Sequence, residues 1–435
     1  MGGSSRETWS SELGLALSLI GVAVGLGNVW RFPYMLGMFG GASFLVIYLV
    51  LVLALGVPGL IAELSISRYV GCGPFKAFVR LGMPGGRVIG VILLVTALAA
   101  VAYYLVVIGW VLWYLILSVS GVLFEEGVSV GVVFEGLTNS PILQLVMHAS
   151  VIVFCVLIVS GGVRKGIELA SKFMMPVVYL VLVLVAVYVF SLPRAVDGLT
   201  FYLRPDWGRV TGMTVLAAMG QVFFSLGLGS TWIFIYGSYI SRRYGVVRSA
   251  VYTAFGDTLA SFIAGLAILP LTFVFGVSPG SGPPLTFITL PEIFRQLSYG
   301  RLISTLFFTA LLFAALLSAV PGFEIFIDAL SNYGVSRRSA AVLMGVVEVV
   351  LGIPSILSIE VLLYNDLLWG STMLPLASLF SILAFGWFVR TSELLKELNT
   401  NDQNITWRIL YYWVRFAMPV MVILILIYGW ISFLT

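Results

Sequence analysis

The stretch AVGLGNVWRFP, Ala23 to Pro33, places glycines, an amide and a cation inside an otherwise apolar segment. With Gly21 included, three glycines crowd this region, and each costs a helix about 1 kcal/mol relative to alanine. The helix is therefore expected to unwind. Freed carbonyl oxygens at such a break can coordinate a cation, and the free N–H groups of the next half-helix can hold a carboxylate. Asn28 adds a hard side-chain oxygen of the kind that sodium prefers.

A second glycine-rich break follows in SLGLGS, Ser225 to Ser230, where Ser225 offers a hydroxyl. Isolated glycines in membrane helices usually serve close packing. Two glycine clusters, flanked by Asn28 and Ser225 in corresponding segments, instead favour a binding site. Transporters bind substrate and ions near the membrane midplane, where their helices are discontinuous.

Acidic residues inside apolar segments also indicate function, because charge within a membrane is costly. Glu63, Asp257 and Glu324 lie in different apolar segments with no nucleophile beside them, so an enzyme is not expected. Cys72 and Cys155 have no Cys/His cluster of metal-ligand spacing around them and are expected to remain unpaired thiols.

The composition is that of a membrane protein. Hydrophobic residues make up 60% of the 435 residues and charged residues 10%, whereas soluble chains carry about 25% charged residues. Runs of about 20 apolar residues recur, each long enough to cross ~30 Å of hydrocarbon. They must be helices, because lipid leaves the backbone no other partners and no alternating strands are present. We predict an all-α integral membrane fold with about eleven spans, roughly 12–38, 41–70, 86–121, 141–160, 166–192, 212–241, 246–276, 301–332, 338–363, 367–390 and 407–434.

The loop charges predict the orientation in the membrane. Lysine and arginine gather in the loops on the N-terminal side, which predicts a cytoplasmic N-terminus and an extracellular C-terminus in the plasma membrane. The net charge of +4 follows from this bias and gives no reason to expect a nucleic-acid partner.

The two breaks predict an internal repeat within a single transporter domain, 1–435. They fall in spans 1 and 6, five spans apart, and an odd number of spans inverts the second copy in the membrane. The predicted 5+5 inverted repeat covers about 12–192 and 212–390, with discontinuous helices 1 and 6 and an extra helix at about 407–434.

Five stretches carry a more specific signal: GVAVGLGNVWRFPY, GGASFLVIYLVLVLALGVPGLIAELSISRYVG, AYYLVVIGW, GQVFFSLGLGSTWIFIYGSYI and FAALLSA. Together they resemble spans 1, 2, 3, 6 and 8 of the neurotransmitter:sodium symporters, and the resemblance covers nearly the whole chain. It implies sodium-coupled uptake of an amino acid or related amine by alternating access. The implied partners are the substrate, sodium and the lipid bilayer, and a homo-oligomer is left open.

The resemblance implies one or two bound sodium ions. The first site would consist of the Ala23 carbonyl and the side chains of Asn28, Ser225 and Asp257. The second would consist of the carbonyls of Gly21, Val24 and Ala314 and the Ser318 hydroxyl.

The resemblance also implies a substrate site in which Tyr104 binds the substrate carboxylate and Phe224 covers the pocket. The implied substrate-binding residues are Ala23, Leu26, Gly27, Ala100, Tyr104, Phe224, Ser225, Gly227, Ser230, Ser318 and Gly322. Several of these residues are small and apolar and would leave a wide apolar pocket. Such a pocket favours a substrate with a bulky hydrophobic side chain, aromatic or branched. Monoamine carriers of the family place an acidic residue at the position of Ala23 or its neighbour Val22. This chain has no acidic residue at either position, which predicts a substrate with a free α-carboxylate.

Gating and bracing roles follow from the same resemblance. The implied residues are Arg31 and Asp366 for the outer gate, Arg6, Trp9 and Asp328 for the inner gate, and Glu63 for bracing the unwound segments. Asp328 enters because the usual acidic partner of Arg6 is here Asn332, one helical turn later. The alternative is that Asp328 is a helix-end carboxylate near Arg337.

Two further positions differ from the family pattern and affect the binding of ions. Asp257 stands where many relatives carry Asn, and a fixed carboxylate does the electrostatic work of a bound chloride. We therefore predict chloride-independent transport; the alternative is a protonated, merely hydrogen-bonded Asp257. Leu317 stands where relatives often place Thr. Either the second sodium site keeps its remaining oxygens with water, or it no longer binds sodium tightly.

Two other functions are consistent with the sequence. Asp257 could take up a proton, which would give a proton-coupled amino-acid transporter. A non-transporting amino-acid sensor with the same fold is the second alternative, although these 435 residues are not expected to form a soluble output domain.

Overall fold

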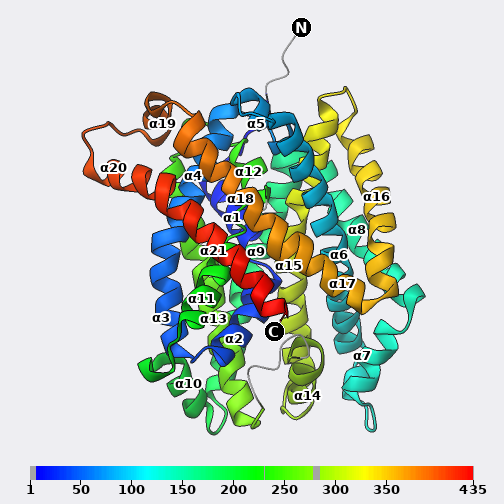
Figure 1. The fold of residues 1–435 in the computed structure, drawn as a ribbon. Helices are drawn as coiled ribbons and strands as arrows, with labels where there is room; N and C mark the ends of the chain where they lie inside the picture. The colour runs from blue at the N-terminus through cyan, green and yellow to red at the C-terminus, as the bar shows by residue number, and fades with distance from the viewer. Residues whose placement is uncertain (1–5, 230, 278–284, 435) are drawn as a thin grey trace.

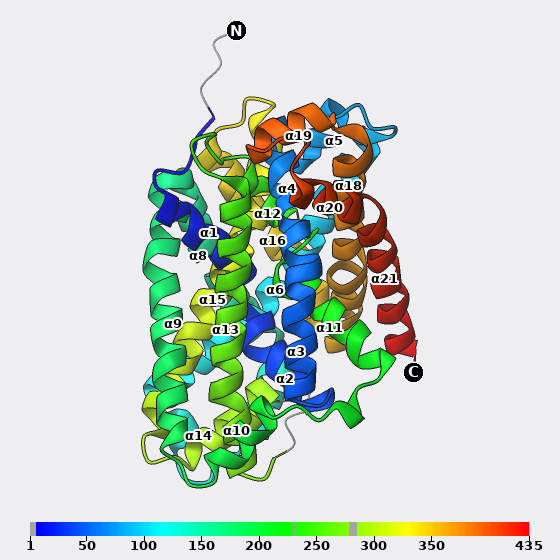
Figure 2. The same cartoon turned by 90° about the vertical axis from the view of Figure 1, so that its left-hand side faces the viewer.

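The computed structural model describes residues 6–229, 231–277 and 285–434, and these residues contain helices and no strands. The helices run side by side between two ends of the molecule, as Figures 1 and 2 show from directions 90° apart. In both views α5 (Pro74–Arg80) and α19 (Thr391–Leu398) lie at the end nearer the N-terminus, and α10 (Ala195–Leu203) and α14 (Leu290–Arg295) lie at the opposite end.

The first half of the chain forms five crossings and their connections. Its elements are α1 (Glu12–Ala23), η1 (Gly27–Arg31), α2 (Phe32–Met38), α3 (Ala42–Leu51), η2 (Val52–Gly56), α4 (Val57–Val70), α5, α6 (Gly86–Ser120), η3 (Val122–Phe124), α7 (Val130–Thr138), α8 (Pro141–Ser160), η4 (Val163–Glu168) and α9 (Leu169–Phe190).

The second half repeats this sequence of crossings. Its elements are α10, η5 (Trp207–Arg209), α11 (Gly212–Ser225), α12 (Trp232–Gly237), α13 (Val246–Val274), η6 (Leu285–Thr289), α14, α15 (Gly300–Ser331), α16 (Arg337–Leu357), α17 (Ile359–Asn365), η7 (Asp366–Met373), α18 (Leu374–Leu383) and η8 (Ala384–Phe388). The C-terminal elements are α19, α20 (Ile405–Tyr412), η9 (Trp413–Ala417) and α21 (Met418–Leu434).

The predicted all-α membrane fold is confirmed. In the described ranges, nine helical units are long and apolar enough to cross a membrane, and a tenth is the pair Glu12–Ala23 and Gly27–Met38, bent by 57° at its break. The flanks of the second break, α11 and α12, account for the remaining predicted crossing. The bounds of the two repeats stay a prediction.

The most deeply buried spanning helix is α15, which lies at the centre of the protein core. Of its most apolar window, 78% is buried inside the protein, whereas only 24% is buried for the C-terminal span 405–431. The last span therefore lies at the edge of the helix bundle, as Figure 2 shows on its right-hand side.

The helix breaks form where the glycines predict them. Val24 leaves the helix with φ −76° and ψ 112°, and the N–H of Gly25 bonds to Asn28 Oδ1 at 2.9 Å instead of to the preceding turn. In the second break Gly227 and Gly229 have φ of 61° and 77°, a left-handed conformation that glycine adopts without a steric penalty.

One predicted boundary is wrong. The apolar pattern predicts that span 9 ends at residue 363, but α16 ends at Leu357 and a new helix begins at Ile359. Ser358 is extended (φ −149°, ψ 128°), and its hydroxyl accepts the N–H of Val361, which caps the new helix. Asp366 consequently lies inside span 10 rather than at its beginning.

Candidate functional site

The two breaks meet α13 in a buried polar cluster. Asn28 Nδ2 donates to Asp257 Oδ1 at 2.6 Å and to Ser225 Oγ at 3.1 Å. The Ser225 hydroxyl donates to Asp257 Oδ2 at 2.8 Å. Ser261 accepts a further bond from Asn28, and the Tyr48 hydroxyl donates to Asp257 at 3.4 Å. The structure thus brings together the three side chains assigned to the first ion site.

The cluster is rich in oxygen and closed to water. Asn28, Asp257 and Ser261 are 0% exposed and Ser225 is 1% exposed. A buried carboxylate needs a cation or hydrogen-bond donors, and the Asn28 amide nitrogen supplies one donor here. To coordinate a cation, the Asn28 amide would turn its Oδ1, which now holds Gly25, toward Ser225 and Asp257.

A hydrogen-bond chain runs next to this cluster at the start of η1. The Leu26 N–H donates to the Tyr104 hydroxyl at 3.4 Å, the Tyr104 hydroxyl lies 2.8 Å from Ser318 Oγ, and Ser318 donates to the Ala315 carbonyl at 3.0 Å. A Cβ added to Gly25 would lie 2.8 Å from Ser318 Oγ. A phenol and free backbone amides at one helix start are the groups that bind a carboxylate.

A cavity of about 340 Å³ opens beside this chain and extends toward α2 and α21. Most of the substrate residues implied by the resemblance line it: Ala23, Leu26, Gly27, Ala100, Tyr104, Phe224, Ser225, Gly227 and Ser318. Ser230 lies outside the described residues.

Gly322 does not line the cavity, against the prediction. A Cβ on Gly322 would lie 2.1 Å from Val101 Cγ2 and 3.6 Å from Trp232 Nε1, so these side chains cover the glycine. Trp232 itself lines the cavity and was missed. The sequence does place this aromatic residue close to the break, two positions after its last residue, Ser230.

The residues of the second ion site lie between α1, α9 and α15. A Cβ on Gly21 would lie 3.2 Å from Leu317 Cδ1 and 3.5 Å from Met175 Cγ, so apolar atoms face α1 at this level. Ser318 directs its hydroxyl to Tyr104 and to the Ala315 carbonyl. Val24 and Ala314 are fully buried beside them.

Glu63 on α4 faces the second break. It is 1% exposed, and its Oε1 accepts the N–H of Gly229 at 2.6 Å. Gly229 has no room for a side chain, because a Cβ would lie 2.3 Å from the Leu374 carbonyl oxygen. The carboxylate therefore holds a backbone amide that the broken helix leaves without a helical partner.

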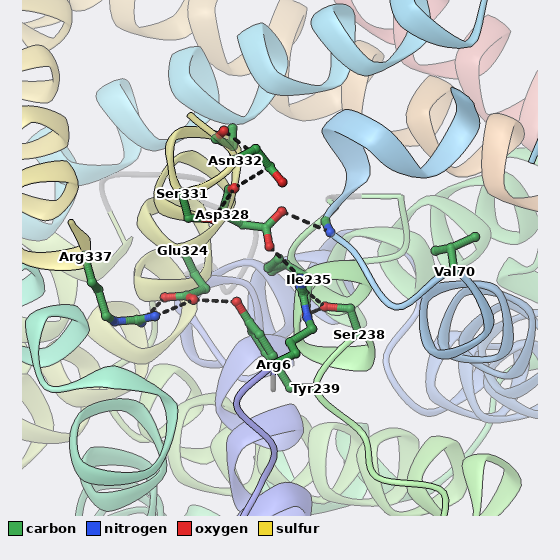
Figure 3. A network of polar contacts seen from close by, with 12 residues as sticks. Arg6, Val70, Ile235, Ser238, Tyr239, Glu324, Asp328, Ser331, Asn332 and Arg337 are labelled. Atoms are coloured by element: carbon green, nitrogen blue, oxygen red, sulfur yellow. Dashed lines mark hydrogen bonds and ion pairs between the residues drawn. The ribbon is translucent and has the colours of Figure 1, made fainter. Parts of the chain in front are cut away.

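The N-terminal segment closes the end of the molecule at which α5 lies. Arg6 Nη1 pairs with Asp328 Oδ1 at 2.8 Å, and Arg6 Nη2 donates to Ser238 Oγ at 2.6 Å. The second Asp328 oxygen accepts the N–H of Gly73 at 3.0 Å (Figure 3). Trp9 is fully buried and donates to the Tyr236 carbonyl at 3.2 Å.

Arg337 pairs with Glu324, which leaves Asp328 to Arg6. The guanidinium donates to Glu324 Oε1 at 3.0 Å, and the Tyr239 hydroxyl donates to the same oxygen at 2.6 Å (Figure 3). Asp328 therefore pairs with Arg6, whereas the alternative made it only a helix-end carboxylate near Arg337. Tyr239 also lies under the Arg6 guanidinium, at 4.5 Å from the ring centre, and so joins the two ion pairs.

The opposite end of the cavity is arranged differently. Arg31 donates to Gln221 Oε1 at 2.9 Å and lies over the Phe224 ring at 4.6 Å. Asp366 lies on η7, where a Cβ added to Gly370 would lie 3.1 Å from Asp366 Oδ1 and 2.3 Å from the Tyr103 hydroxyl. Phe224 is 37% exposed. The N-terminal end is thus closed by ion pairs, and the cavity reaches Arg31 on the other side.

The sequence and the fold are similar to those of known membrane transporters. A sequence model of the sodium:neurotransmitter symporter family matches residues 6–128 and 124–435. An uncharacterized sodium-dependent transporter of Haemophilus influenzae is 30% identical over 97% of this chain and 98% of the relative. The uncharacterized sodium-dependent transporter YhdH of Bacillus subtilis is 32% identical over 96% of each chain. The crystal structure of MhsT in complex with L-phenylalanine superposes with a TM-score of 0.89 at 35% identity, covering 98% of this chain and 100% of MhsT.

Proposed function

We propose that this chain, which belongs to the sodium:neurotransmitter symporter family, couples sodium entry to the uptake of amino acids with hydrophobic side chains. The family consists of membrane transporters, and the relatives are named as sodium-dependent. One observation carries the finer proposal. A single helix break presents Asn28 to Asp257 and Ser225 on one side and the Leu26 amide to Tyr104 on the other.

The ion is proposed to bind at Asn28, Ser225 and Asp257, together with the Ala23 carbonyl. Sodium prefers hard oxygen donors, and these side chains supply them in a site closed to water. The carboxylate balances the charge of the ion in surroundings of low dielectric constant. Transport is therefore proposed to need no chloride.

The substrate is proposed to bind with its carboxylate at Tyr104 and the Leu26 and Gly27 amides. Its side chain would extend between Ala100 and Gly227, in a cavity whose walls are mostly apolar. The MhsT structure, which holds L-phenylalanine, supports an amino acid of this kind. Size selection is worth only about 1–3 kcal/mol per methylene, so several hydrophobic amino acids should be accepted.

Transport is proposed to proceed by alternating access, with the N-terminal side cytoplasmic. The described conformation closes that side through Arg6 and Asp328, while the cavity extends toward Arg31. Arg31 and Asp366 would close the cavity over bound substrate, and ion release would open the Arg6 pair. Each step requires that the ligand bind one state more tightly than the other.

The test is binding of labelled L-leucine and L-tryptophan to the purified full chain, with sodium replaced by choline or potassium, and with or without chloride. Saturable binding that requires sodium and ignores chloride is expected. Binding that ignores sodium but changes with pH would replace the proposal by proton coupling. Sodium-dependent binding without accumulation in proteoliposomes would replace it by a sensor.

A further inference from the structure

Trp232 lies on the wall of the cavity that is proposed to hold the substrate. Trp232 is the first residue of α12 and follows Thr231, whose φ of 63° turns the chain sharply at the end of the second break. Its indole lines the cavity together with Ala100, Gly227 and Ser318. The side chain is partly exposed although it lies in the protein interior, so its surface faces the cavity.

The indole lies beside the residue proposed to hold the substrate carboxylate. The ring centres of Trp232 and Tyr104 are 6.3 Å apart with an interplanar angle of 41°. Tyr104 bonds to Ser318 and to the Leu26 amide at the polar end of the cavity. An amino acid anchored there would place its side chain within reach of the Trp232 ring.

The surrounding residues hold the indole in this position. On α15, Gly322 leaves room for Trp232 Nε1, which would be 3.6 Å from a Cβ at that residue. Val101 on α6 fills the space behind Gly322, since its Cγ2 would be 2.1 Å from the same Cβ. The wall that the sequence predicts to consist of small residues is thus covered by a flat aromatic surface.

We propose that Trp232 selects aromatic amino acids over aliphatic ones of similar size by contacting the substrate ring. Offset or edge-to-face aromatic pairs are favoured beyond the area that they bury, by about two- to tenfold in affinity. The proposal rests on the proposed amino-acid transport and goes further by naming the preferred class and the residue that sets it.

The experiment measures the affinities of L-phenylalanine and L-leucine for purified full-length protein in sodium, by competition with labelled L-leucine. Trp232→Ala should weaken L-phenylalanine binding by about two- to tenfold and leave L-leucine binding nearly unchanged. Trp232→Phe keeps an aromatic ring and should retain most of the preference. Trp207→Ala removes an indole that is 57% exposed outside the cavity and serves as the matched control.

Three outcomes would overturn the inference. Tighter L-phenylalanine binding by Trp232→Ala would mean that the indole obstructs the pocket. Equal losses for both amino acids would mean a structural role. If Trp232→Ala does not fold, a Trp232→Phe variant that loses the preference while keeping its thermal stability would contradict ring contact. Absence of sodium-dependent binding by the wild type would instead overturn the proposed function, which separates the two failures.

Discussion

Arg6 and Asp328 form an ion pair of 2.8 Å that joins the segment before α1 to α15. Because Asp328 also accepts the N–H of Gly73, the same carboxylate holds the connection between α4 and α5. Three parts of the chain thus meet at one side chain, which is 9% exposed. Opening this end of the protein requires that all three separate.

Cys72 should report that opening. It precedes Gly73 and is 5% exposed, and burial raises the pKa of its thiol, so the reactive thiolate is scarce while the end is closed. Asp328→Ala is expected to increase maleimide labelling of Cys72 by about tenfold, the factor for ~1.4 kcal/mol in the gate equilibrium. The rise of labelling with pH should also move to lower pH.

The controls for this labelling are Cys72→Ser, which leaves only Cys155, and Asp328→Glu, which keeps the charge. Labelling rates of Cys72 that are the same in the wild type and in Asp328→Ala would show that the pair does not close this end.

Asp257→Asn is expected to make substrate binding depend on chloride, because it removes the fixed charge beside Asn28 and Ser225. The apparent sodium affinity should fall as well. Binding in chloride and in gluconate checks this. Asp197→Asn removes an exposed acid on α10, away from the cluster, and should create no chloride requirement. A chloride requirement in the wild type would contradict the prediction.

Leu317→Thr is expected to add a sodium ion. In the wild type, Leu317 and Met175 present apolar atoms to Gly21, so we expect a Hill coefficient for sodium near one. A threonine hydroxyl at this position should raise it toward two. Leu317→Val has the branching of threonine without its oxygen and is the matched control. A wild-type value near two, or equal values for the two variants, would argue against this reading of the site.

Glu63→Ala is expected to lower stability, because the Gly229 N–H would lose a buried acceptor at 2.6 Å. An unsatisfied buried donor costs about 1–3 kcal/mol. Thermal unfolding in detergent should show a lower midpoint for Glu63→Ala, with Glu63→Gln in between. Glu360→Ala removes an exposed carboxylate and should have little effect. Unchanged unfolding of Glu63→Ala would rule out the bracing role.

The sequence alone predicted the membrane helices and the two breaks. Apolar runs must be helical in lipid wherever they occur, and glycine weakens a helix at its own position. The breaks at Gly25 and Gly227 therefore follow from local composition. The clustering of Asn28, Ser225 and Asp257 was reached only through the family resemblance, because these residues are more than 25 positions apart in the chain.

Other features were decided by tertiary packing. Asp328, Asn332 and Glu324 all lie near the end of α15, and the sequence does not say which carboxylate meets Arg6 and which meets Arg337. The orientation of the helices around α15 selects the pairs. The contact of Trp232 with the cavity likewise depends on Val101 and Gly322, from two other helices. Local propensity acts within a few residues, whereas the choice of side-chain partners needs helices that are distant in sequence to be placed side by side.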